Sequence, residues 1–118
     1  MISVIEKILC DYLDSMLSYS VFFEKPKQDI PSEYVLVEKT GGGTSEHIRE
    51  ATIAIQTIGE SLLRAAEMAY EVEEVMQNAV TLDAIASVET NSIYNHTHEM
   101  VATTKEYRYQ GVYSVIFY

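Results

Sequence analysis

The stretch from about residue 60 to residue 79 places the strongest constraint on the fold of this chain. Apolar side chains recur there at three- and four-residue steps, and charged or amide side chains fill the opposite side. The apolar stripe consists of Leu62, Ala65, Ala66, Ala69, Val72 and Met76. This period predicts an amphipathic helix. Because small side chains allow a helix axis to approach a flat partner closely, we expect the helix to lie on a sheet.

A second amphipathic helix is predicted over residues 2 to 17, where apolar residues again follow the helical period. Cys10, the one cysteine of the sequence, falls on the polar side of this helix. We therefore expect a surface or subunit-contact thiol, and no internal disulfide is possible. No basic residue is adjacent to Cys10, so the sequence does not indicate an activated nucleophile.

The other segments favour strands, because they are short and rich in β-branched and aromatic residues. They cover residues 19–24, 34–40, 48–57, 84–91 and 107–118. A glycine-containing stretch over residues 40–47 predicts a hairpin with a flexible tip between the second and third strands. Residues 91–106 are polar and predict a loop. The last strand carries apolar groups on both faces, as is typical of a central strand or a subunit interface.

These elements predict an α+β fold in the order α-β-β-β-α-β-β, with two helices packed on a mainly antiparallel sheet of about five strands. The length of 118 residues and the hydrophobic content of 47% suit a single domain over residues 1–118. A core of that size needs neither a metal nor a disulfide to hold it together.

The net charge of −10, from 18 acidic and 8 basic residues, argues against sequence-specific nucleic-acid binding. The simplest reading of this charge is solubility. Charged residues at Glu6, Lys7, Asp11 and Asp14 interrupt the N-terminal apolar pattern before it reaches signal-peptide or membrane-spanning length. We expect a cytoplasmic protein with no membrane association.

Candidate catalytic and metal sites are weakly supported. His96 and His98 would point the same way from an extended segment, but no third ligand is placed to complete a metal shell, so a solvated loop is favoured. The glycines at 41–43 lack the following lysine of a phosphate-binding loop and lead into a strand. Paired acids such as Glu67 and Glu71 lie on a predicted solvated helix face, where Arg64 can pair with Glu60, Glu67 or both. We expect no catalytic residue, metal or cofactor.

Two sets of residues are better candidates for partner contacts. Gly41, Gly42 and Gly43 would form a mobile tip that orders when it meets another protein. Arg108 stands between Tyr107 and Tyr109, where a guanidinium can pair with an acidic group across an interface or stack on a ring. The plainer alternative is an ordinary outward-facing charge on a strand.

Three stretches resemble the lambda-type tail terminator (tail completion) family of long-tailed bacteriophages and prophages. Residues 30–43 (IPSEYVLVEKTGGG) resemble the family's strand that runs into a glycine-rich loop. Residues 53–61 (IAIQTIGES), followed by the alanine-rich helix to Ala69, resemble its strand leading into a long helix. Residues 107–110 (YRYQ) resemble its Arg-Tyr signature near the C-terminus.

The resemblance implies a structural virion subunit rather than an enzyme. Such a subunit forms a homo-oligomeric ring, typically hexameric, that caps the completed tail tube at the head-proximal end. Its partners would be its own copies, the tail tube protein and a head-completion or connector protein involved in head-tail joining. Two other classes stay open: a small ligand-binding or enzymatic α+β domain of unknown substrate, and a dimeric host-interaction module.

Overall fold

The computed structural model describes residues 4–45, 48–97 and 106–118. The elements follow the predicted order α-β-β-β-α-β-β, so the α+β class is confirmed. A short 3-10 helix, η1, follows α2. The element bounds are α1 (Ile5–Met16), β1 (Ser20–Phe22), β2 (Tyr34–Ser45), β3 (Ile48–Gly59), α2 (Leu62–Gln77), η1 (Asn78–Thr81), β4 (Ile85–Asn95) and β5 (Tyr107–Phe117).

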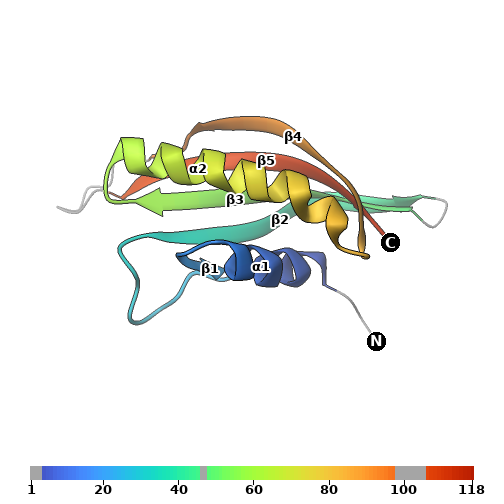
Figure 1. Cartoon of the computed structure of the whole chain (residues 1–118), viewed down its shortest axis with the longest axis horizontal. Coiled ribbons are helices and arrows are strands. Elements are labelled where there is room, and N and C mark those ends of the chain that lie inside the picture. Colours follow the sequence, from blue (N-terminus) through green and yellow to red (C-terminus); the bar gives the residue numbers. More distant parts are fainter. Residues whose placement is uncertain (1–3, 46–47, 98–105) are drawn as a thin grey trace.

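The described strands form a five-stranded sheet in the order β1-β2-β3-β5-β4 (Figure 1). β1 runs parallel to β2, and the other neighbouring strands are antiparallel. β3 and β5 pair without a register shift from Arg49 opposite Phe117 to Gly59 opposite Tyr107. β5 therefore lies between two other strands, as predicted for a central strand, and its positions alternate between buried and half-buried from Gly111 onward.

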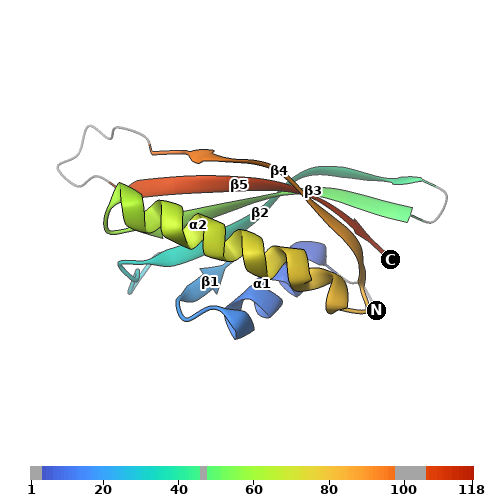
Figure 2. The same ribbon diagram turned by 45° about the horizontal axis from the view of Figure 1, so that its top comes forward.

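Both helices pack on the same face of the sheet (Figure 2). α2 contacts β3, β5 and β4, whereas α1 contacts β1 and β2. Side chains from alternate positions of the strands meet the helices in a buried core, because successive side chains of a strand point to opposite faces. This core includes Val35, Val37, Ile53, Ile55, Tyr113, Val115, Leu9, Leu13, Met68 and Val72. The described helices leave the other face of the sheet uncovered.

The long helix follows the prediction with one correction. Ala65 and Ala69 are buried against the sheet, as expected. Leu62, however, is 40% exposed, and Met68, which is not part of the predicted apolar stripe, is fully buried. Leu62 is the first helical residue, and the side chain of such a residue points back past the helix start, beyond the sheet contact.

The prediction for Cys10 is wrong, because its side chain is buried with a relative exposure of 5%. The helical period correctly placed this residue away from the main apolar arc of α1. β1, however, returns along that side of the helix, and the Cys10 thiol donates a hydrogen bond to the Val21 carbonyl oxygen, with Sγ and O 3.4 Å apart. Burial raises the pKa of this thiol above its ordinary value, so the reactive thiolate is disfavoured.

Two strands extend further than predicted. β2 continues through the three glycines to Ser45, and β4 continues to Asn95 through residues assigned to a polar loop. In both places the backbone pairs with a neighbouring strand, β3 in one case and β5 in the other. Ladder hydrogen bonds involve only backbone groups, so low strand propensity does not end a strand whose partner continues.

Candidate functional site

The two predicted sets of contact residues lie at opposite ends of β3. Arg108 pairs with Ile58 near the end of β3, whereas Gly42 pairs with Ala51 near its start. Seven residue steps along an extended strand separate Ile58 from Ala51, a span of about 24 Å at ~3.4 Å per residue. The structure therefore does not bring the two sets together into one site.

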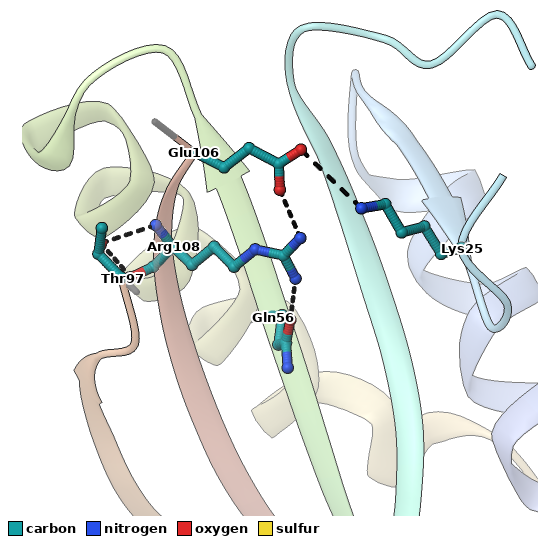
Figure 3. A network of polar contacts seen from close by, with 5 residues as sticks. All are labelled: Lys25, Gln56, Thr97, Glu106 and Arg108. Atoms are coloured by element: carbon teal, nitrogen blue, oxygen red, sulfur yellow. Dashed lines mark hydrogen bonds and ion pairs between the residues drawn. The ribbon is translucent and has the colours of Figure 1, made fainter. Parts of the chain in front are cut away.

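Arg108 lies on the uncovered face of the sheet and is held by two side chains (Figure 3). Nη1 donates a hydrogen bond to Oε1 of Gln56 at 2.6 Å, and Nη2 donates to Oε2 of Glu106. The side chain is only 18% exposed. A guanidinium with two partners in fixed positions is an oriented charge rather than a freely moving one.

The backbone of Arg108 is anchored as firmly as its side chain. The Arg108 amide donates to Thr97 Oγ1 at 3.0 Å, and the His96 amide donates to the Arg108 carbonyl oxygen at 2.8 Å. Thr97 Oγ1 also lies 3.2 Å from that carbonyl oxygen. These contacts join the start of β5 to the end of β4 and fix the backbone position from which the Arg108 side chain extends.

Polar side chains extend the Arg108 contacts across the sheet. Gln56 donates to Gln110 at 3.1 Å, and Gln110 in turn donates to the Tyr94 hydroxyl. On the other side, Lys25 Nζ lies 4.0 Å from Oε1 of Glu106. We call this set the Arg108 network, and its members are Lys25, Glu106, Arg108, Gln56, Gln110 and Tyr94.

The network contains residues that the sequence interpretation did not single out. Gln56 and Gln110 are opposite one another in the β3–β5 register. Each is a polar residue flanked by mainly apolar neighbours in its strand, and this was a usable signal. Lys25, which lies shortly after β1, carried no such signal in the sequence. Its approach to Glu106 depends on how the chain folds back.

Tyr107 and Tyr109 do not join Arg108 in one aromatic cluster. Alternation along β5 places both tyrosines on the face that carries Tyr113 and Val115, whereas Arg108 lies on the opposite face. Arg108 instead pairs with Glu106 of its own chain. The plain reading of an outward strand charge is therefore also incomplete, because this charge is engaged within the subunit.

Gly41, Gly42 and Gly43 belong to an ordered part of β2 rather than to a flexible tip. A register shift between Lys39 and Gly41 leaves Thr40 unpaired, and pairing with β3 then resumes. Figures 1 and 2 show the β2–β3 hairpin projecting beyond the ends of both helices. We call this projection, residues 40–45 and 48–52, the β2–β3 arm. Its exposed side chains include Ile48, which is 53% exposed.

The remaining candidates do not assemble into a reactive centre among the described residues. His47 and His98 lie outside them, and the described histidine, cysteine and acidic residues form no group of three that would hold a metal ion. Arg64 pairs with Glu33, Nε to Oε2 at 2.9 Å, whereas the sequence predicts Glu60 or Glu67 as its partner. It also lies over the ring of Tyr19 at 5.7 Å.

The uncovered face offers fixed hydrogen-bonding groups and partly exposed charges beside apolar side chains. Within the described part of the chain, no helix is both long and apolar enough to span a bilayer. No protein-family model matches the sequence, and no curated protein gives a significant match.

Proposed function

We propose that this protein is a structural virion subunit that terminates a bacteriophage tail. It closes the completed tail tube as a homo-oligomeric ring, hexameric in the form that the resemblance implies, and offers a surface to a head-completion or connector protein. The observation that carries the proposal is the element order α-β-β-β-α-β-β, together with the three local sequences that resemble tail terminators.

Two unlike surfaces support an assembly role. A closed ring requires heterologous contacts, in which one patch of a subunit meets a different patch of its neighbour. The uncovered sheet face with the Arg108 network is one patch, and the projecting β2–β3 arm is a second of different shape and chemistry. In this proposal the arm reaches the tail tube protein or a neighbouring subunit.

The charge of the chain also suits this role. In such a virion DNA must pass through the ring, and a subunit of net charge −10 repels phosphates instead of retaining them. The proposed activity requires no cofactor and no substrate. The protein acts in the host cytoplasm during assembly and then at the head-proximal end of the tail.

The test is to add the purified protein to tail tubes assembled without it and to image them by electron microscopy. A ring of density at one tube end, with no further growth when tube protein is added, is the expected result. Bare ends and continued growth would contradict the proposal and favour a ligand-binding or enzymatic domain instead.

A pair of variants assigns the contact. Ile48→Asp places a charge on the arm, and Leu63→Asp places the same charge on the first turn of α2, where Leu63 is 71% exposed. If the arm contacts the tube or a neighbouring subunit, Ile48→Asp abolishes capping and Leu63→Asp retains it. Equal capping by both variants would remove the arm from the contact.

A further inference from the structure

A hollow beside the Arg108 network combines apolar walls with acidic and phenolic oxygens. It lies where the connector before β2 faces the end of β3, and its volume is about 470 Å³. Ile30, Pro31 and Ile58 supply apolar surface, while Tyr34, Glu60 and Glu106 supply oxygen atoms. Ligand pockets of ~300–1,000 Å³ show this combination of apolar walls and a few convergent polar groups.

The Tyr34 hydroxyl is the unexplained group of this hollow. The residue is 1% exposed, yet its hydroxyl has no hydrogen-bond partner among the described residues. Its ring is held in place by edge contact with Phe22, with centroids 6.0 Å apart. Burial raises the pKa of Tyr34, the nearby Glu106 carboxylate raises it further, and the Arg108 guanidinium lowers it. Buried polar groups without partners are rare and call for an explanation.

Glu106 also has spare capacity to accept hydrogen bonds. Arg108 occupies its Oε2 atom, and Lys25 Nζ lies 4.0 Å from Oε1, beyond hydrogen-bonding distance. Glu60 lies at the exposed end of β3 on the same hollow. The lining therefore presents two carboxylates and one phenol oxygen, all able to accept, on a chain of net charge −10.

We propose that this hollow receives a positively charged side chain, arginine or lysine, from a partner protein. The aliphatic stem packs on Ile30, Pro31 and Ile58, and the charged head is bound by Glu60, Glu106 and the Tyr34 hydroxyl. Basic side chains bury their stems in this way while their heads keep polar partners. The inference stands on these contacts alone and does not depend on the terminator role.

The first experiment is an NMR titration of the full chain with N-acetyl-arginine methylamide and with N-acetyl-lysine methylamide. N-acetyl-citrulline methylamide, which has nearly the shape of the arginine compound but no charge, is the control. We expect saturable shifts of the Gly59 and Glu106 amide signals with one or both cations and none with citrulline. The relative affinities identify which basic side chain fits. Equal shifts with citrulline, or no shifts at these amides with either cation, would overturn the proposal.

Variants separate this site from general attraction to an acidic protein. Tyr34→Phe removes only a hydroxyl without a described partner, so the fold is retained and the affinity for the cation falls roughly 3- to 10-fold. Glu60→Gln lowers the affinity by a similar factor. Glu74→Gln, which removes one exposed charge further along α2, changes it less than about twofold. Wild-type affinity in Tyr34→Phe, or equal losses in the two glutamate variants, would disprove the assigned contacts.

Discussion

At the residue scale, two adjacent glycines of the β2–β3 arm tolerate a side chain very differently. Gly42 has a φ of +148°, and a Cβ atom there would lie 2.2 Å from the carbonyl oxygen of Glu50. A Cβ at Gly43 would meet no atom within 4 Å. The local backbone conformation therefore requires glycine at position 42, whereas position 43 has room for a side chain.

We expect Gly42→Ala to lower the free energy of unfolding by about 1–3 kcal/mol, because strain at a position of positive φ adds to a clash with backbone. Gly43→Ala is the matched control, and its effect stays within ~0.5 kcal/mol, as is usual for exposed positions. Urea unfolding followed by circular dichroism measures both variants. Equal stabilities would mean that the arm relaxes around either side chain.

The hydroxyl of Tyr113 is buried in the core and has no hydrogen-bond partner among the described residues. By contrast, the Tyr12 hydroxyl donates to the Val75 carbonyl oxygen at 2.9 Å and joins α1 to α2. Tyr113→Phe should therefore leave thermal stability unchanged or raise it by up to ~1 kcal/mol, whereas Tyr12→Phe lowers it by ~1 kcal/mol. Destabilisation by Tyr113→Phe would reveal a partner for its hydroxyl.

At the element scale, the junction between β3 and α2 sets how the long helix meets the sheet. Thr57 Oγ1 donates to the Ala65 carbonyl oxygen at 2.9 Å. A Cβ at Gly59 would lie 2.7 Å from the Ala65 backbone nitrogen, so the strand end and the first helical turn are in direct contact. Ser61 caps the helix, since its hydroxyl accepts a hydrogen bond from the Arg64 amide at 3.1 Å.

Replacing the capping residue tests how much this junction depends on the start of α2. Ser61→Ala leaves the Arg64 amide without its acceptor and should cost about 1 kcal/mol of stability. Ser61→Asp supplies another good capping oxygen near the positive end of the helix dipole, so its stability should remain near that of the wild type. The midpoints of urea unfolding compare the two. A similar loss in both variants would argue against capping as the cause.

At the scale of the whole molecule, buried phenols link stability to alkaline pH. Burial raises the pKa values of Tyr19 and Tyr113 above the ordinary value of tyrosine. Above pH ~10 the unfolded chain releases these protons while the folded chain retains them. The stabilisation is therefore complete below pH ~10 and declines as pH rises further, by at most about 1.4 kcal/mol per pH unit for each phenol.

Tyr113→Phe isolates one phenol from the general effect of a chain that already carries a net charge of −10. Between pH 9 and pH 11 we expect this variant to lose less stability than the wild type in parallel urea titrations. Parallel losses would assign the alkaline instability to charge repulsion alone.

The described molecule is elongated and measures 49 × 27 × 24 Å. Both helices cover one face of the sheet, and the β2–β3 arm continues past them (Figure 2). The second face keeps the Arg108 network and the adjoining hollow accessible. These two features are the parts of the molecule on which the proposed contacts depend.

Local spacing in the sequence determined the element order and the main apolar side of each long element. The three- and four-residue steps of α2 and the alternation of β5 are examples, because each element must turn one apolar side toward a core. The same alternation places Arg108 on the opposite side of the last strand from Tyr107 and Tyr109, as is observed in β5.

Only the tertiary structure decided which segments meet. β1 covers the polar side of α1 and buries Cys10, and β3 keeps the glycines of β2 in a paired strand. Folding likewise brings Glu106 to Arg108 and places Tyr34 in the wall of the hollow. Local periodicity reports which side of an element is apolar. The partner that covers that side, or leaves it open, depends on pairing between residues distant in the chain.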